Sequence, residues 1–494
     1  MVALRFKRDG KWHEMSYAEL DDEVARVAGG LVAQGIQPGD RVAVLGQTSP
    51  EWTICDLAID RVGAVCVPIY PTSSRQEREW VLSDSGARML VEPPQLPRGE
   101  PVAPVPRADD EPSTIIYTSG TTGPAKGCVL TPANLRAAYE SLDSLVTVGA
   151  GDVVYLYLPL AHLFARMTQA MTLARGATLA YFGGDITEIV TELTEVRPTH
   201  LPSVPRLFEK VYTKVTALTE GMERERVHAL VRGAFGGRLR EALTGAAPIS
   251  PEILEFFAAC GVPVYEAYGM TESTAVISAN CPGATRFGSV GRPLPGVEVR
   301  IADDGEVLAK GRNVFPGYHR NDGASRDALR DGWLHTGDLG ALDDDGYLHI
   351  TGRKKDLIIT AGGKNISPAN LENDLRRCRW ISHAVMYGDR RPYAVALITL
   401  DAEEILPWAR ENGLPEDIAE LARHPRVLEM VQDAVERANS AYSPPERIRR
   451  FTVLEHDFSQ ETGELTPTMK LRRKIVHDRF TELFSALYGG NLRS

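Results

Sequence analysis

The sequence has few cysteines and no long apolar run. Its six cysteines are spread over 494 residues without a CxxC pair or a dense framework, which excludes a disulfide-stabilised scaffold and is typical of reduced thiols. No apolar stretch approaches the ~20 residues that span a bilayer, and the opening MVALRFKRDG lacks the apolar core of a secretory signal. We therefore expect a cytoplasmic protein without a transmembrane segment.

An excess of positive charge is also missing. The formal net charge is −11, whereas nucleic acids and anionic membranes favour a basic surface, so neither is expected as the main partner. Hydrophobic residues make up 43% and charged residues 24% of the chain, values typical of a globular protein. A chain of 494 residues exceeds the size of one ordinary core, so we expect at least two domains.

Two common phosphate-binding motifs are absent, although one stretch has the composition of a phosphate loop. Residues 117–127, YTSGTTGPAKG, hold three glycines, five hydroxyl side chains and one lysine. Glycine lets backbone N–H groups converge on an anion. The motif GxxxxGK[ST] fails because Lys126 lies between Ala125 and Gly127, and the stretch does not read GxGxxG. On composition alone, a surface turn explains the stretch equally well.

The first part of the chain alternates strand and helix signals. Residues 41–46, RVAVLG, read as a buried strand, and Ser-Pro-Glu at 49–51 reads as a helix start. Gly63 is placed to end that helix before a second apolar strand at 64–70. This order predicts an α/β fold with a parallel sheet and crossover helices. Further strands are expected at 152–160, 177–182 and 262–269.

The composition changes at two later places. Residues 93–112 are rich in proline and acidic side chains, which predicts a solvated connector. From about Gly283 the sequence predicts shorter strands and tight turns, followed by an α+β tail with a helix start at Ser367. Four charged residues at 353–356 separate two apolar runs, and we expect a hinge or domain boundary there.

The glycine-rich stretch is the first of six motifs in a particular order. The other five are TGAAP (244–248), YEAYGMTE (265–272), GWLHTGDLG (332–340), GRKKDLI (352–358) and LTPTMK (465–470). Together they resemble the acyl-adenylate-forming superfamily, over nearly the whole chain. Within it, LPLAHLFAR, SVPRLFEKVY, SVGRPLPGVEV and LIITAGGKNISPANLE look like the long-chain fatty acyl-CoA synthetases.

The resemblance implies a fold, a reaction and a set of cofactors. A large α/β domain over residues 1–354 would bind ATP and the acid, and a small mobile α+β domain would cover 355–494. The implied enzyme is an acyl-CoA synthetase that converts a fatty or other hydrophobic acid to acyl-AMP and then to a CoA thioester. ATP, magnesium and CoA are the implied cofactors and reaction partners.

The resemblance also implies the residues that hold the nucleotide. Thr118 to Thr122 with Lys126 would lie over the β- and γ-phosphates, Tyr268 would face adenine, Thr271 would contact the α-phosphate, and Glu272 would bind magnesium. From local sequence alone, a packed tyrosine beside a helix-capping Thr-Glu pair is the alternative. The implied ATP- and AMP-binding set is Thr118, Ser119, Gly120, Thr121, Thr122, Gly123, Lys126, Gly245, Ala246, Ala247, Glu266, Ala267, Tyr268, Gly269, Thr271, Asp338 and Arg353.

Several of these positions have a specific implied role or a departure from the family pattern. Gly245 to Ala247 would line the adenine edge, where the family more often has two glycines. Asp338 would accept from the ribose hydroxyls, although an aspartate before glycine is also common in turns. Arg353 would reach the ribose or phosphates, and Lys355 matches the hinge between half-reactions.

Lys470 is the implied lysine of adenylation. A compact cation on a long stem suits the charge that develops on the α-phosphate and carboxylate oxygens, and Lys470 would act only when the second domain closes. Its basic surroundings, KLRRK, also fit a solvated surface. His162 would lie near the acyl carboxylate, unless it is structural. Gly362 and Gly363 would let pantetheine pass close to the backbone.

Alternative activities are also open. An acyl-AMP ligase would load an acyl carrier protein, and another relative would use ready-made acyl-AMP without adenylating. A non-catalytic sensor is less consistent with the presence of Lys470 and Glu272. The identity and length of the acid, the existence of a homodimer and the final acceptor are not readable from the sequence.

Overall fold

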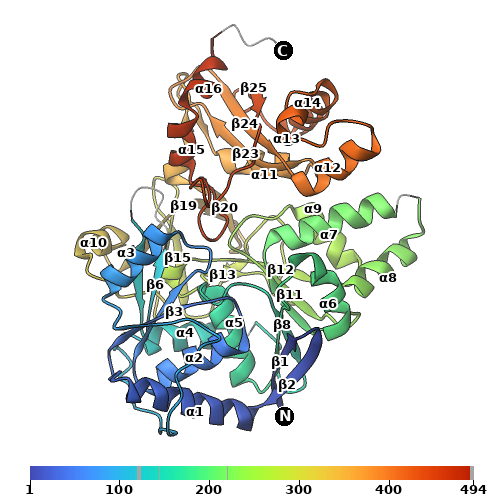
Figure 1. Cartoon of the computed structure of the whole chain (residues 1–494). Helices are drawn as coiled ribbons and strands as arrows, with labels where there is room; N and C mark the ends of the chain where they lie inside the picture. Colours follow the sequence, from blue (N-terminus) through green and yellow to red (C-terminus); the bar gives the residue numbers. More distant parts are fainter. Residues whose placement is uncertain (119–123, 144, 220, 490–494) are drawn as a thin grey trace. The chain divides into compact units, whose positions relative to one another are not determined.

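The computed structural model describes residues 1–118, 124–143, 145–219 and 221–489. The chain divides into two compact units, Met1–Thr336 with Ala341–His349, and Gly337–Gly340 with Ile350–Ser494. Figure 1 follows the chain from one terminus to the other. Within the described residues, none of the helices combines the length and the apolar character needed to cross a membrane.

One sheet of the first unit has six strands in the order β17-β7-β6-β4-β3-β5. Strands β3, β4, β5 and β6 pair in parallel, whereas β7 is antiparallel to β6. The predicted parallel sheet is therefore confirmed in this part of the chain. The strands are β3 (Arg41–Leu45), β4 (Val65–Ile69), β5 (Met89–Val91), β6 (Thr114–Thr118), β7 (Lys126–Leu130) and β17 (Gly317–Tyr318).

A second sheet has nine strands in the order β14-β13-β12-β11-β10-β8-β9-β1-β2. Its central strands β8 to β12 run in parallel, so their carboxyl ends meet at one edge. The strands are β1 (Val2–Arg8), β2 (Lys11–Ser16), β8 (Val153–Leu156), β9 (Thr178–Tyr181), β10 (His200–Ser203), β11 (Glu241–Thr244), β12 (Val264–Tyr268), β13 (Ser278–Ala279) and β14 (Arg292–Pro293).

Helix α2 of the first unit begins and ends where its sequence predicts. For α2, the Ser49 hydroxyl accepts from the Trp52 N–H at 3.2 Å, Pro50 occupies the first turn, and Gly63 follows with φ +71°. The predicted helix start and stop are both confirmed. The helices are α1 (Tyr17–Ala33), α2 (Pro50–Arg61), α3 (Arg75–Ser85), α4 (Pro132–Asp143), α5 (Leu163–Ala174), α6 (Ile189–Val196), α7 (Pro205–Leu218), α8 (Arg224–Ala234), α9 (Pro251–Ala259) and α10 (Asp322–Ala328).

The proline-rich segment 93–112 is a connector without helix or strand, and none of its residues is buried, as predicted; in addition, part of it contacts α1. The Gly99 N–H donates to the Arg26 carbonyl at 2.9 Å, which ties the segment to α1. A Cβ atom on Gly29 would lie 1.8 Å from the Glu100 carbonyl oxygen. The segment therefore packs against the glycine pair of α1, where the missing side chains allow the two backbones to touch.

A third sheet follows Gly283, but its main strands are not shorter than the earlier ones, contrary to the prediction: β19 has 10 residues, and β16 and β20 have 6 each. Its order is β15-β16-β19-β18, with β20 paired to β19. The strands are β15 (Val297–Ile301), β16 (Glu306–Gly311), β18 (Leu329–Arg330), β19 (Trp333–Leu342) and β20 (Leu348–Arg353).

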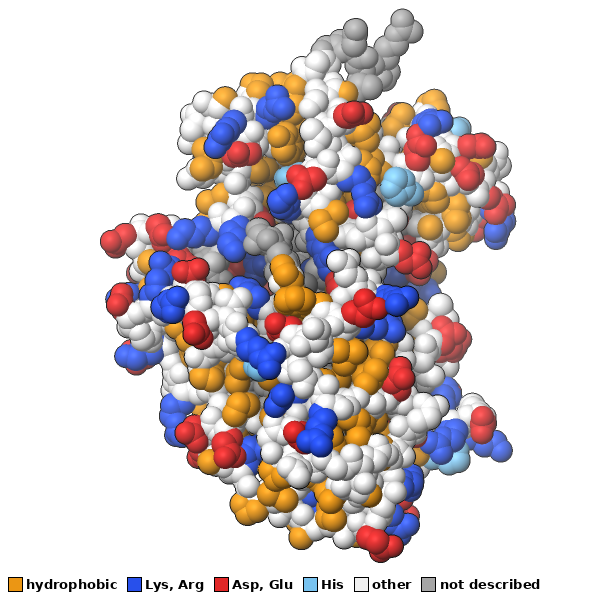
Figure 2. Space-filling view, turned by 60° about the vertical axis from the view of Figure 1, so that its left-hand side comes forward, with side chains coloured by type: hydrophobic (Ala, Val, Ile, Leu, Met, Phe, Trp, Pro, Cys, Tyr) orange, Lys and Arg blue, Asp and Glu red, His pale blue; other side chains and the backbone are white. Residues whose placement is uncertain are grey.

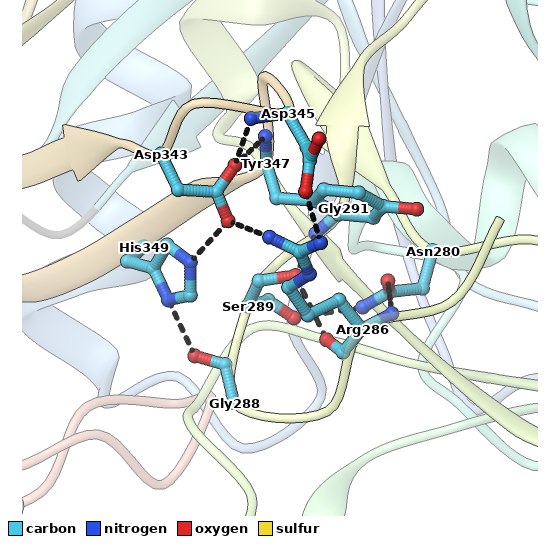
Figure 3. A network of polar contacts seen from close by, with 9 residues as sticks. All are labelled: Asn280, Arg286, Gly288, Ser289, Gly291, Asp343, Asp345, Tyr347 and His349. Atoms are coloured by element: carbon cyan, nitrogen blue, oxygen red, sulfur yellow. Dashed lines mark hydrogen bonds and ion pairs between the residues drawn. The ribbon is translucent and has the colours of Figure 1, made fainter.

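A polar network fastens the turn between β19 and β20. Figure 3 shows the Arg286 guanidinium between the carboxylates of Asp343 and Asp345. His349 Nε2 lies 3.1 Å from the Asp343 Oδ2 atom, and its Nδ1 lies 3.0 Å from the Gly288 carbonyl oxygen. The turn is therefore fixed to the loop that carries Arg286.

The second unit is an α+β structure, as predicted. Its three-stranded sheet has the order β23-β24-β25, and every residue of β24 is buried. Its elements are η3 (Lys354–Asp356), β21 (Ile358–Ile359), β22 (Asn365–Ile366), α11 (Pro368–Arg376), β23 (Ile381–Tyr387), β24 (Ala394–Leu400), α12 (Ala402–Glu411), α13 (Ile418–Leu421), α14 (Pro425–Ser440), β25 (Ile448–Val453), α15 (Arg473–Arg479) and α16 (Thr481–Ala486). Figure 2 shows basic and acidic side chains interspersed over one face of the protein.

Candidate functional site

The glycine-rich stretch joins two antiparallel strands. Thr118 ends β6 and pairs in register with Lys126, the first residue of β7. The Lys126 ammonium lies 4.3 Å from the centre of the Tyr318 ring, within the range of a cation–π contact. The predicted loop residues Ser119, Gly120, Thr121, Thr122 and Gly123 lie outside the described residues.

Tyr318 also contacts the predicted magnesium ligand. Its hydroxyl donates to Glu272 Oε1 at 2.7 Å, from β17 to the short helix η2 (Thr271–Ser273). Burial raises the pKa of Tyr318, and the nearby Glu272 charge raises it further. The hydroxyl therefore keeps its proton and remains a donor. Because Tyr318 contacts both Lys126 and Glu272, the three residues form one polar cluster.

The turn that carries Thr271 and Glu272 is held by backbone and amide contacts. The Asn313 side-chain amide donates to the Ser273 carbonyl at 2.9 Å, and the Thr274 hydroxyl donates to the Asn313 carbonyl at 2.6 Å. A Cβ atom on Gly269 would lie 2.1 Å from the Ala275 carbonyl oxygen. Glycine is therefore required where the chain folds back on itself.

Sequence reasoning missed Asn313 and Tyr318. Both belong to the stretch NVFPGYH, residues 313–319, which lies outside the six motifs. Its proline–glycine turn followed by a polar aromatic residue is the signal that could have drawn attention to it.

The predicted adenine-side residues lie together at the carboxyl ends of β11 and β12. Thr244 and Glu266 are register partners in these parallel strands. A Cβ atom on Gly245 would lie 3.0 Å from the Ala267 carbonyl oxygen, and the next residue, Ala246, has φ +68°. This close approach places Gly245, Ala246, Glu266, Ala267 and Tyr268 in one region, and Ala247 follows directly.

Glu266 is a buried carboxyl group within this region. Its exposed fraction is 6%, and burial raises its pKa to about 8, an effect that a hydrogen bond from the Ile249 backbone partly offsets. The side chain is therefore mainly protonated at neutral pH and can donate a hydrogen bond.

A largely apolar cavity lies within the first unit. It encloses about 800 Å³ of atom-free space, part of which opens to solvent. Helix α5, strands β8, β10, β11 and β12, and the segments at 145–148 and 275–282 contribute to its walls. The apolar lining includes Phe164, Met167, Met171, Leu201, Leu243 and Val276. A cavity with these walls can receive a hydrophobic chain.

His162 occupies the position before α5. Its Nδ1 atom accepts from the Phe164 N–H at 3.2 Å and so caps the helix. Phe164, two residues on, lines the cavity. This places His162 at the end of a cavity wall, while its predicted contact with an acyl carboxylate stays a prediction.

The other predicted residues belong to the second unit. Arg353 Nε lies 2.8 Å from Asp338 Oδ1, and the Asp338 side chain is 7% exposed. Lys355 lies in η3 and is exposed. Gly362 and Gly363 form the turn between β21 and β22, and Gly363 has φ +75°, a conformation that favours glycine.

Lys470 lies in a short turn of the second unit. Its N–H donates to the Thr466 hydroxyl at 3.0 Å, and the Thr466 N–H donates to the Lys470 carbonyl at 2.8 Å. Met469, before it, has φ +61°. The turn therefore fixes the backbone of Lys470, whose side chain is exposed.

The residue types fit magnesium bound together with a nucleotide. Across the described parts of the chain, no group of three or more His, Cys, Asp or Glu side chains is placed to hold a metal ion. Glu272 supplies one carboxylate, and Tyr318 engages its Oε1 atom. Magnesium commonly binds through one or two carboxylates with phosphate oxygens and water, so Glu272 fits such a role beside phosphates.

Comparisons with known proteins give consistent matches. The family described as AMP-binding enzyme matches residues 1–101 and 91–319, and the AMP-binding enzyme C-terminal domain matches 355–491. Long-chain-fatty-acid--CoA ligase FadD15 of Mycobacterium bovis is 37% identical over 97% of this chain and 93% of its own. The peroxisomal Long chain acyl-CoA synthetase 6 of Arabidopsis thaliana is 31% identical over 97% of this chain and 82% of its own.

The fold is also shared with a solved structure. O-succinylbenzoate Coenzyme A Synthetase (MenE) from Bacillus subtilis, in complex with ATP and magnesium ion, matches with a TM-score of 0.75 at 24% identity. The match covers 96% of each chain.

Proposed function

We propose that this chain, which belongs to the AMP-binding enzyme family, is an acyl-CoA synthetase. It converts a hydrophobic carboxylic acid and ATP to acyl-AMP and pyrophosphate, and then transfers the acyl group to CoA with release of AMP. One observation carries the proposal: the first unit holds the polar cluster of Lys126, Tyr318 and Glu272 together with an apolar cavity.

The polar cluster suits the first half-reaction. A carboxylate oxygen attacks the α-phosphorus of ATP, and the bond to the leaving pyrophosphate breaks. Lys126 is a cation beside the predicted phosphate loop, and Glu272 would hold magnesium with phosphate oxygens; the ion supplies charge neutralisation when bound. Preorganised charges of this kind stabilise a developing pyrophosphate without reorganisation.

The cavity indicates the class of acid. Its walls are mostly apolar side chains, which favour an acid with a hydrocarbon chain because burial of apolar surface drives binding. The names of the Mycobacterium bovis and Arabidopsis thaliana relatives refer to long-chain fatty acids and long-chain acyl-CoA. We therefore propose a fatty or similar hydrophobic acid as the substrate, in the cytoplasm.

The residues of the second unit would complete the two half-reactions. We assign Lys470 to adenylation, Asp338 and Arg353 to the ribose and phosphates, Lys355 to the hinge, and Gly362 with Gly363 to the CoA side. The functional domains would meet between residues 354 and 355. The Asp338–Arg353 pair at 2.8 Å supports a preorganised ribose-binding carboxylate.

The test is pyrophosphate release with magnesium-ATP across a panel of carboxylic acids, with and without CoA, alongside mass spectrometry of the products. Acid-dependent pyrophosphate with a CoA thioester is the expected result. Acyl-AMP without a thioester would instead favour an enzyme that loads an acyl carrier protein. Turnover of synthetic acyl-AMP alone would mean that adenylation is absent. Sedimentation of the active protein would decide between monomer and homodimer.

A further inference from the structure

The cavity borders four strands of the nine-stranded sheet, β8, β10, β11 and β12. Glu241 is the first residue of β11, and Gly245 directly follows the carboxyl end of that strand. Glu241, Ala242 and Leu243 line the cavity, and Gly245 belongs to the proposed nucleotide region. Four residues of strand correspond to about 13 Å. Glu241 therefore marks the end of the cavity that is distant from the proposed nucleotide region, where the acid would react.

A polar pair occupies this distant end. His200 on β10 is the register partner of Glu241 on β11, and both line the cavity. The His200 residue is 5% exposed, and its Nε2 atom has no hydrogen-bond partner within the described chain. Nε2 lies 3.7 Å from Glu241 Oε2, which is too far for a hydrogen bond.

The other polar side-chain atoms of His200 and Glu241 already have hydrogen-bond partners. His200 Nδ1 lies 2.9 Å from the Thr199 hydroxyl, and both Glu241 oxygens accept from Thr147. Burial lowers the pKa of His200 more strongly than the neighbouring carboxylates raise it, so the imidazole is neutral. An unpaired buried nitrogen is unfavourable, and a ligand that pairs with it gains binding free energy.

We propose that the distant end of the cavity binds a hydroxyl group on the acyl chain, between His200 Nε2 and the Glu241 carboxylate. The preferred substrates are then acids whose hydrocarbon chain ends in a hydroxyl. This inference rests on the proposed acyl-CoA synthetase function and specifies its substrate class.

A hydroxyl fits this position better than a charged group. It can donate to Glu241 and accept from a protonated Nε2, or donate to Nε2 in the other tautomer. A second carboxylate would be repelled by Glu241, because the nearby Arg240 is already paired with Asp152 at 2.8 Å. An ammonium group would lose its hydration in a mostly apolar cavity. The other titratable groups in the lining, Tyr265 and Cys281, are neutral because burial raises the pKa of each.

The test compares kcat/KM for pyrophosphate release between straight-chain acids of increasing length and the same acids with a hydroxyl on the last carbon. At the length that spans the cavity, we expect the hydroxy acid to be preferred by about ten- to a hundredfold, as for hydrogen bonds to charged groups. Equal values at every length overturn the proposal, as does a preference for terminal amines or carboxylates. If no acid supports pyrophosphate release, the result contradicts the proposed function and, with it, this inference.

Two variants then test whether His200 causes the preference for hydroxy acids. His200→Phe keeps a ring but removes Nε2, and it should reduce the hydroxy-acid preference to about one. Thr172→Val is the matched control, because Thr172 lines the same cavity and its hydroxyl already donates to the Thr168 carbonyl at 2.7 Å. The preference ratio of this variant should equal that of the unmodified protein. An unchanged ratio in His200→Phe overturns the assignment. The wild-type comparison needs no variant, so the proposal stays testable if His200→Phe does not fold.

Discussion

The hydroxyl of Tyr318 donates to Glu272 Oε1 at 2.7 Å, and the two residues come from different elements of the first unit. The same ring lies 4.3 Å from the Lys126 ammonium. Tyr318 therefore orients the carboxylate that we assign to magnesium and contacts the cation that we assign to pyrophosphate. A side chain that holds two charged groups in place acts as a positioning residue for both.

The substitution Tyr318→Phe should lower kcat/KM for ATP by about tenfold and raise the magnesium concentration needed for the half-maximal rate. The physical reason is the loss of one hydrogen bond to a charged group, with Glu272 left free to rotate. The measurement is pyrophosphate release against magnesium and ATP concentration. Tyr212→Phe is the matched control, since Tyr212 donates to Glu252 at 2.9 Å on an exposed surface. Equal magnesium dependence in both variants would contradict the role.

Replacing Lys470→Ala should abolish acyl-AMP formation, because the variant loses a cation that would meet the charge developing in adenylation. Thioester formation from supplied acyl-AMP and CoA should survive. Each half-reaction is followed separately by mass spectrometry. Lys474→Ala serves as control, because Lys474 pairs with Asp478 on an exposed helix surface. Equal loss of both half-reactions in Lys470→Ala would rule out the assignment.

Glu266 should make stability depend on pH. Its pKa is raised from 4.5 to about 8 in the folded chain, so the folded protein holds a proton that the unfolded chain releases. The stabilising contribution is complete below pH 4.5 and is lost as pH rises towards and through about 8. Glu266→Gln, which resembles the protonated acid, should remove this dependence.

The measurement for Glu266 is the difference in Tm between the two proteins from pH 5 to pH 9. The variant should gain relative to the wild type as pH rises. A difference that does not change with pH would mean that the Glu266 carboxyl titrates alike in the folded and unfolded chain.

A buried ion pair holds α5 against α2. Arg166 Nη2 lies 2.6 Å from Asp56 Oδ1, with side chains 14% and 9% exposed. Asp56→Asn should destabilise the protein by about 3 to 5 kcal/mol, because the Arg166 charge stays buried without its partner. Asp109→Asn, which breaks the half-exposed pair with Arg136, should change stability little. Denaturant unfolding of both variants makes the comparison, and similar losses would contradict it.

Local sequence was sufficient for many elements of the fold. The cap at Ser49 and the stop at Gly63 are encoded within one helix, and strands β3 and β4 lie where their apolar runs predict. The α/β fold with a smaller α+β part and the family were also confirmed, because six motifs in order carry far more information than any one of them.

Other features depend on packing between distant segments. Composition correctly predicted a solvated connector at 93–112, but not its contact with α1, where Gly29 and Gly30 remove the side chains that would have kept it away. Proline and acidic residues indicate a lack of regular structure, but they do not indicate which other segment the backbone will contact.

The sequence by itself determined many of the elements and the family, since helix caps, apolar periodicity and motifs act over a few residues. Only the tertiary structure decided that Tyr318 meets Glu272, 46 residues earlier, and that His200 faces Glu241 across two parallel strands. Strand register and turn geometry bring such residues together. A local sequence pattern does not predict which distant side chains will form a hydrogen bond and which polar atoms will stay without a partner.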